Sequence, residues 1–182
     1  MVHGCSIRRS IYSVSLINSS HIMRIYVADL AKYNNGELAG EWVELDVKTQ
    51  LWDEIKRICG DHEWVIHDYE LPFKIDEHEN IDNLQQLASI WDGLSNYEKA
   101  GLSFLVDNGN DLSFALEHYE NLSIYTADSW EDFAEELVDQ GCFGDIPERL
   151  QYYIDYEAIG HDLSIDHTEY EFEGQNYYIA DY

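Results

Sequence analysis

Beyond residue 75 the chain carries 26 acidic side chains and only two basic ones, Lys99 and Arg149. The 182 residues have a formal net charge of −27, and this segment alone accounts for −24. Charge of one sign repels itself and destabilises a compact fold, so an imbalance of this size needs a functional reason. A basic partner is the natural counterpart. A nucleic-acid ligand is excluded, because binding phosphates requires a basic surface.

The remaining composition is that of a folded protein. The chain is 45% hydrophobic and 14% aromatic, whereas disordered acidic tails are poor in aromatic residues. Its length suffices for one sizeable core or for two to three small subdomains. The cysteines Cys5, Cys59 and Cys142 are odd in number and far apart, which favours neither a disulfide framework nor a zinc site and indicates a reducing, cytoplasmic setting. No apolar run approaches the roughly 18 residues of a membrane span, so no membrane partner is expected.

Residues 1–22 differ from the rest, since they hold two arginines and no acidic residue. Their short apolar patch, residues 11–17, is interrupted by two serines and is followed by no A-x-A cleavage site, which argues against a signal peptide. We expect a disordered extension or an upstream start, with the domain proper beginning at Met23.

From residue 23 to 78 the pattern predicts a small α/β subdomain with antiparallel strands. Strands are expected over residues 23–30, 41–47 and 63–71, where apolar and polar residues alternate, with a loop over 31–40. A helix is expected between the last two strands and should end at Gly60. Its apolar residues at helical spacing are Leu51, Trp52, Ile55 and Ile58.

The composition then shifts, and two further subdomains are expected. Residues 79–121 read as a helical subdomain of short helices joined by polar connections. Residues 122–182 read as a C-terminal α+β subdomain with a short strand, an acidic helix, a second helix after Pro147 and a terminal hairpin around Gly174. The expected fold class is therefore α+β, with three small subdomains in a row.

The acidic helix lies in the stretch DSWEDFAEELVDQG, residues 128–141. Ser129 is a good N-cap, and Asp132 three residues later completes a capping-box-like pattern. Apolar residues recur at the spacing of a buried face, while the stretch contains no lysine or arginine. Like charges four residues apart cost a few tenths of a kcal/mol per pair, and the last three acids lie too late to benefit from the helix dipole. The apolar face comprises Trp130, Phe133, Ala134, Leu137 and Val138, and the acids are Glu131, Asp132, Glu135, Glu136 and Asp139.

No catalytic or metal-binding motif stands out. Carboxylate pairs such as Asp155/Glu157 are too abundant to indicate glycoside hydrolysis, which needs a set separation and one raised pKa. Residues 107–118 look briefly like a calcium loop, but Leu112 occupies the position of the turn glycine and His118 that of the final glutamate. The sequence therefore favours a protein that is not an enzyme and has no cofactor and no metal. The alternatives are an acidic protein-interaction or halophile-type solvated domain, and a small acidic enzyme.

Four segments, in order, closely resemble the ArdA family of antirestriction proteins. They are MRIYVADLAKYNNGELAGEW (23–42), IHDYELPF (66–73), SWEDFAEELVDQG (129–141) and IPERLQYYIDYEAIGHDL (146–163). The resemblance runs from Met23 to the C-terminus. His161 is a departure, since many members are expected to carry an arginine there.

The resemblance implies a protein of mobile genetic elements that protects incoming DNA. It implies inhibition of Type I restriction-modification enzymes through mimicry of B-form DNA at the methyltransferase core, by an elongated homodimer. From Met23 onward the chain has 8 basic and 37 acidic residues, so a dimer would carry −58. Duplex DNA presents one negative charge per ~1.7 Å of axis, so this charge matches roughly 100 Å of duplex.

Particular residues follow from this reading. The aromatic segment LQYYIDY is predicted to supply a subunit contact through Tyr152, Tyr153 and Tyr156, because exposed tyrosines favour interfaces; ordinary core packing is the alternative. The phosphate surrogates are expected to act collectively, and they are Asp128, Glu131, Asp132, Glu135, Glu136, Asp139, Asp155, Glu157 and Asp162.

Overall fold

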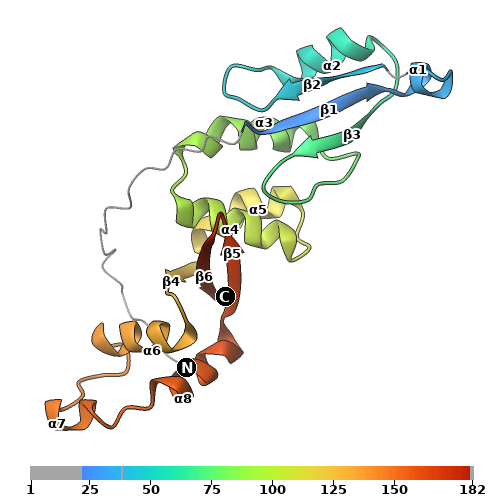
Figure 1. The fold of residues 1–182 in the computed structure, drawn as a ribbon. Coiled ribbons are helices and arrows are strands. Elements are labelled where there is room, and N and C mark those ends of the chain that lie inside the picture. The colour runs from blue at the N-terminus through green and yellow to red at the C-terminus, as the bar shows by residue number, and fades with distance from the viewer. Residues whose placement is uncertain (1–21, 38, 181–182) are drawn as a thin grey trace. The chain divides into compact units, whose positions relative to one another are not determined.

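A computed structural model describes residues 22–37 and 39–180 (Figure 1). The predicted extension, residues 1–22, lies outside the described residues except for its last position. Contacts divide the chain between Glu120 and Asn121 into two compact units. We call the described parts the N-terminal unit (22–120) and the C-terminal unit (121–180). The further boundary expected at residue 78 stays a prediction.

The N-terminal unit begins with a three-stranded antiparallel sheet in the order β2-β1-β3. Ile25 and Val27 of the central strand are fully buried, as the alternation in the sequence predicts. The helix α2 contacts both β1 and β2. The bounds are β1 Arg24–Asp29, β2 Gly40–Glu44, α2 Leu51–Cys59 and β3 Trp64–Glu70.

Two details of this region differ from the expectation. The buried face of α2 contains Cys59, whereas Trp52 is 50% exposed. The expected loop over 31–40 contains a short helix, α1 Leu30–Asn34. The carboxylate of Asp29 caps this helix by accepting a hydrogen bond from the Lys32 amide at 3.1 Å. An aspartate at the end of a strand is a start signal that could have revealed α1.

The second half of the N-terminal unit is helical, as predicted for residues 79–121. Asn80 caps the first helix, and Ser95 forms a capping box with Glu98 at the start of another. Polar caps of this kind separate short helices because they satisfy free backbone amides at each start. The elements are α3 Ile81–Ile90, η1 Trp91–Gly93, α4 Asn96–Asp107, α5 Leu112–His118 and η2 Tyr119–Asn121.

The C-terminal unit contains a second antiparallel sheet, in the order β4-β6-β5. The predicted hairpin is confirmed. Its two-residue turn, Glu173 and Gly174, has positive φ at both positions, as the favoured type I′ hairpin turn requires. The central strand β6 is buried from Tyr177 to Ala180. The bounds are β4 Ser123–Thr126, β5 Thr168–Phe172 and β6 Gln175–Ala180.

Three helices complete this unit: α6 Trp130–Asp139, α7 Glu148–Gln151 and α8 Tyr156–Asp166. The sequence predicted one helix after Pro147, and this prediction is wrong because the chain leaves the helical path after Gln151. Asp155 then starts α8 by accepting a hydrogen bond from the Ala158 amide at 3.0 Å. A short acidic side chain that bonds to the local backbone favours a helix start over a helix interior.

The helices α6 and α8 pack against each other, and Phe133 of α6 is fully buried in the core between the helices and the sheet. Its ring stacks on that of Tyr178, with centroids 5.0 Å apart. The two helices meet closely at Gly160, where a Cβ atom would lie 2.7 Å from the backbone oxygen of Trp130. The structure thus confirms the α+β class and shows how α6 is held.

Gly160→Ala is expected to force these helices apart, because a backbone oxygen cannot move aside as a side chain can. Overpacking of this kind costs about 1–3 kcal/mol. The melting temperature of the C-terminal unit should fall by several degrees, as measured by circular dichroism. Gly93→Ala is the matched control, since a Cβ atom there meets nothing within 4 Å. Equal melting temperatures for the two variants would contradict the close contact.

Across residues 22–37 and 39–180, none of the helices combines the length and the apolar character that crossing a membrane requires.

Candidate functional site

The helix α6 forms as the sequence predicts, with one buried face and one acidic face. The Ser129 hydroxyl accepts a hydrogen bond from the Asp132 amide at 3.1 Å and donates one to the Asp132 carboxylate at 2.6 Å. Leu137 and Phe133 lie in the core. The indole of Trp130 donates to the Glu169 carboxylate at 3.2 Å, which connects α6 to β5. The carboxylates on the opposite side of α6 are thus held on a fixed support.

All nine predicted phosphate surrogates lie on two elements or on the residues that start them. Six belong to α6 and the turn before it, and three to α8 and its N-cap. Because α6 and α8 are in contact, the structure brings the two groups into one unit. Eight of the nine side chains are exposed and Glu136 is half-buried. Their combined role as a DNA-like surface stays a prediction.

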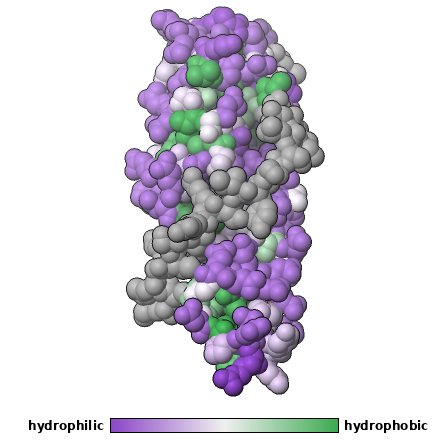
Figure 2. Space-filling view, turned by 90° about the vertical axis from the view of Figure 1, so that its left-hand side faces the viewer, coloured by the Kyte–Doolittle hydropathy of each residue, from purple (hydrophilic) through white to green (hydrophobic). Residues whose placement is uncertain are grey.

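The acids of the C-terminal unit have few basic residues near them in the described part of the chain. Residues 121–180 contain 15 Asp and Glu residues and one Arg or Lys, Arg149. Among the residues of this unit that the structure describes, no carboxylate forms an ion pair, and neither does Arg149. Figure 2 shows that hydrophilic side chains dominate the face it draws, with hydrophobic ones in small separate patches. The negative charge of this unit is therefore uncompensated within the unit.

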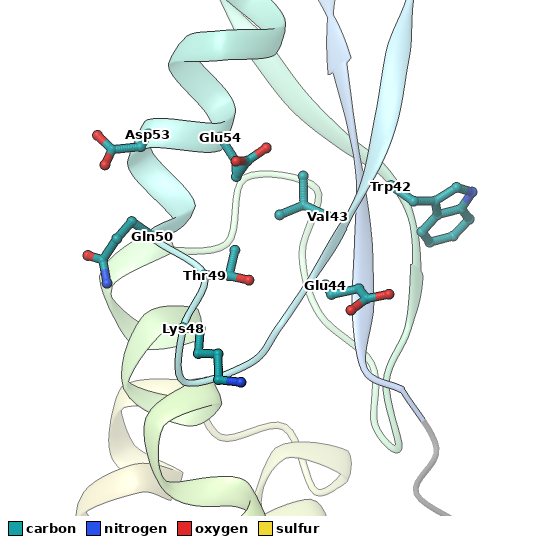
Figure 3. A pocket seen from close by; sticks show the side chains of 8 residues that line it. All are labelled: Trp42, Val43, Glu44, Lys48, Thr49, Gln50, Asp53 and Glu54. Atoms are coloured by element: carbon teal, nitrogen blue, oxygen red, sulfur yellow. The ribbon is translucent and has the colours of Figure 1, made fainter.

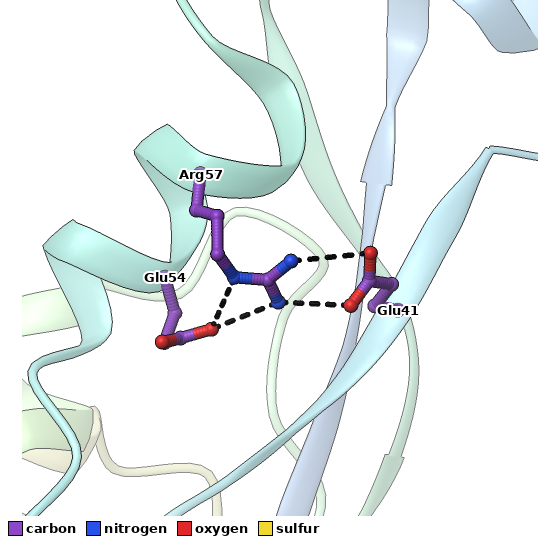
Figure 4. A network of polar contacts seen from close by, with 3 residues as sticks. All are labelled: Glu41, Glu54 and Arg57. Atoms are coloured by element: carbon purple, nitrogen blue, oxygen red, sulfur yellow. Dashed lines mark hydrogen bonds and ion pairs between the residues drawn. The ribbon is translucent and has the colours of Figure 1, made fainter.

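The N-terminal unit handles its charge differently. Arg57 of α2 lies between two carboxylates, with nitrogens 2.8 Å from Glu41 and 2.9 Å from Glu54 (Figure 4). Arg24 forms a two-pronged pair with Glu70, both contacts at 2.7 Å. Hydrogen bonds from the guanidinium groups lower the pKa of Glu41 and of Glu70 below their usual range. Internal pairing thus neutralises part of this surface.

One carboxylate of the N-terminal unit is fully buried. Oδ2 of Asp29 lies 2.9 Å from Nδ1 of His62, and Oδ1 accepts a hydrogen bond from the Lys32 amide at 3.1 Å. The hydrogen bond with His62, the largest cause, lowers the pKa of Asp29. Burial of the carboxylate opposes this shift, and the other polar contacts support it.

We expect this carboxylate to make the N-terminal unit sensitive to acid. Because the folded pKa is below the unfolded value of about 3.9, the stabilisation is complete above pH ~4 and is lost as the pH falls through the folded pKa. Asp29→Asn should lower the melting temperature at pH 7 and weaken its dependence on pH below ~4. The measurement is thermal unfolding at several pH values. Asp61→Asn, an exposed neighbour, is the control, and identical pH profiles of the two variants would refute the role of Asp29.

The three tyrosines predicted as a subunit contact are placed unequally. Tyr152 is 88% exposed and Tyr153 is 83% exposed, so ordinary core packing does not account for either ring. Tyr156 is half-buried and packs against the core that contains Phe133. A subunit contact through these residues stays a prediction.

His161 lies exposed on α8, within the same group of acids. The effect of a histidine in place of the expected arginine stays a prediction.

The described residues form a cleft in each unit. The first cleft lies in the N-terminal unit between β2 and α2. Its lining residues include Lys48 beside several acidic side chains (Figure 3). The second, which we call the α6 cleft, has a volume of about 470 Å³. Sequence reasoning missed its members Asp145 and Gln151; the glycines of GCFGD are a turn signal that could have pointed to this region. The α6 cleft is lined by Glu135, Val138, Asp139, Gly141, Gly144, Asp145, Ile146, Gln151, Tyr152 and Tyr156.

Across residues 22–37 and 39–180, no three His, Cys, Asp or Glu side chains are grouped so that they could hold a metal ion.

The model of a protein family described as "Antirestriction protein (ArdA)" matches residues 25–178. No curated protein sequence matches the chain. The matched range includes every described helix and most of the last strand, so it covers most of both units.

Proposed function

Since the chain belongs to the ArdA family of antirestriction proteins, we propose that it inhibits Type I restriction-modification enzymes by presenting carboxylates in place of DNA phosphates. It acts as a binding protein and not as an enzyme. The observation that carries the proposal is the C-terminal unit, where 15 carboxylates stand without an ion pair among the described residues. Carboxylates that are not paired within the chain are available to a basic partner.

The density of charge along α6 supports the proposal. The helix has 10 residues and carries five acids. At 1.5 Å per residue it is ~15 Å long, which gives one charge per ~3 Å. One strand of DNA carries one phosphate per ~3.4 Å of axis. A row of lysines and arginines that binds a DNA strand would therefore meet a similar linear charge on α6.

The partner that fits this surface is the methyltransferase core of a Type I enzyme, whose DNA-binding groove must be basic. A homodimer, with −58 from Met23 onward in its two chains, would supply the charge of roughly 100 Å of duplex. The protein itself binds no nucleic acid. Its place of action is the cytoplasm, where a mobile element would use it to protect incoming DNA.

Competition with DNA tests the proposal. The protein and a labelled duplex compete for a purified Type I methyltransferase core in a series of salt concentrations, followed by fluorescence anisotropy. The duplex should be displaced at low salt and progressively less as salt rises. Failure to displace the duplex at low salt would reject the proposal.

Single charges should matter little in this assay, because a field shared by many carboxylates changes only slightly when one is removed. Glu131→Gln is the suitable variant, since Glu131 is exposed on α6, and it should displace the duplex almost as well as the unaltered protein.

A domain whose acids serve only solubility would behave differently. It should leave the duplex bound and should unfold at low salt, which sedimentation would detect.

A further inference from the structure

The α6 cleft has a composition that the shared acidic surface lacks. Three carboxylates line it, those of Glu135, Asp139 and Asp145, and two tyrosine rings form walls beside them. Among its described lining residues there is no lysine or arginine. It combines a concave shape, concentrated negative charge and aromatic faces in one place.

In the first cleft, basic side chains of the same chain offset part of the negative charge. Its acids include Glu54, which is already paired with Arg57 at 2.9 Å, and it contains the amine of Lys48. The carboxylates of the α6 cleft have no such partner among the described residues. The α6 cleft differs because no lysine or arginine stands among its described lining residues and none of its three carboxylates forms an ion pair there, so its charge is open to a cation from outside.

The two tyrosine walls of the α6 cleft differ in exposure. Tyr156 packs against the core around Phe133, so its ring is held in place. Glu135 and Asp139 line the same cleft, and burial, followed by the charges of these two carboxylates, raises the pKa of the Tyr156 phenol. Tyr152 is 88% exposed, so its ring is open to a ligand. One packed ring and one exposed ring can enclose a flat cationic group.

We infer that the α6 cleft receives a single arginine side chain of the basic protein partner. A guanidinium group pairs with carboxylates through two parallel hydrogen bonds and stacks on aromatic faces, and a lysine amine does neither as well. Arginine and tyrosine are also enriched among the few interface residues that carry most of the binding energy. The inference rests on the proposed function, and it adds one anchored contact to a field that is otherwise shared.

A small probe tests the cleft without the restriction enzyme. N-acetyl-arginine amide is titrated into the full chain, and the backbone amide shifts are followed by NMR. N-acetyl-citrulline amide, which has nearly the same shape but no charge, is the control. Arginine should give saturable shifts confined to residues 135–156, and citrulline none. Equal responses to the two probes, or arginine shifts spread evenly over all acidic surfaces, would overturn the inference.

Two adjacent tyrosines provide matched variants. Tyr152 lines the cleft and Tyr153 does not, although both rings are more than four-fifths exposed. Neither change to alanine removes a core contact, so both variants should fold. Tyr152→Ala should abolish the response to the arginine probe and weaken binding to the methyltransferase core roughly tenfold or more. Tyr153→Ala should change the response to the arginine probe by less than about threefold, because its ring does not line the cleft.

A charge-matched pair gives an independent comparison. Glu135→Gln with Asp139→Asn removes two charges from the cleft, whereas Glu131→Gln with Asp162→Asn removes two exposed charges elsewhere. The first pair should weaken binding to the methyltransferase core at least about tenfold more than the second. The reason is that it also removes the carboxylates that would pair with the guanidinium in the cleft. Equal weakening by the two pairs would show that only total charge matters.

The outcomes separate the two proposals. If the unaltered protein fails to displace the duplex, the proposed function is rejected. If it displaces the duplex but the Tyr152 and Tyr153 variants weaken equally, only the arginine inference is rejected. If Tyr152→Ala instead converts a dimer to a monomer in sedimentation while Tyr153→Ala does not, a second copy occupies the cleft and the inference is likewise overturned.

Discussion

Raising the salt concentration from 50 to 200 mM should weaken the complex with a Type I methyltransferase core by about 10³-fold. The estimate follows from the DNA case, where a protein that makes 6–10 phosphate contacts loses roughly 10³ to 10⁵ in affinity over this range. Nine surrogate carboxylates on α6 and α8 are comparable in number. The loss arises because salt competes for the basic groove and screens the carboxylates. Equilibrium titrations at four or five salt concentrations would measure it.

Neutralising all nine phosphate surrogates should remove most of the salt dependence of binding. It should also abolish inhibition of the restriction enzyme. Each aspartate is replaced by asparagine and each glutamate by glutamine. The N-cap at Asp155 then keeps an oxygen that accepts the Ala158 amide, because asparagine caps helices about as well as aspartate. Circular dichroism is the control for folding. A neutralised protein that folds, binds tightly and keeps the steep salt dependence would place the contact surface elsewhere.

Phe133→Ala should unfold the C-terminal unit and abolish inhibition, although every carboxylate remains. The Phe133 side chain is fully buried, stacks on Tyr178 and meets the His167 ring at 5.2 Å. Truncating a buried phenylalanine to alanine costs about 3–5 kcal/mol, which is a large part of the total stability of a small domain. Near-ultraviolet circular dichroism and limited proteolysis would detect the unfolding.

This second prediction separates charge from geometry. If the arrangement of carboxylates on α6 and α8 matters, the unfolded variant cannot inhibit. Phe143→Ala is the control, because Phe143 is 42% exposed and its loss should change stability by less than about 0.5 kcal/mol. Full inhibition by an unfolded Phe133 variant would show that acidic composition alone suffices and would remove the need for a DNA-like surface.

Prediction from the sequence succeeded where the governing forces are local. The Ser129 cap and the apolar spacing from Phe133 to Leu137 predicted α6, and the structure has both. The hairpin around Gly174 was also predicted, since its turn needs positive φ. Prediction failed where two local signals compete: the apolar residues after Pro147 favoured one helix, but the cap at Asp155 divides it in two.

The α6 cleft could not have been predicted, because its members come from α6, the following turns and the start of α8. Their proximity depends on the close contact of α6 with α8 at Gly160, and no periodicity in the sequence encodes such a contact. The same holds for Arg57, whose partner Glu41 lies 16 positions away on a strand.

The amino-acid order alone settled the sign and the uneven distribution of the charge, the apolar face of α6 and the resemblance to the ArdA family. These depend on composition, helical period and short motifs, which act between near neighbours along the chain. Which carboxylates are paired and which stand open, and which tyrosine lines a cleft, emerged only from the folded chain. Ion pairs and cavities depend on distances through space, and those distances exist only once distant segments have packed together.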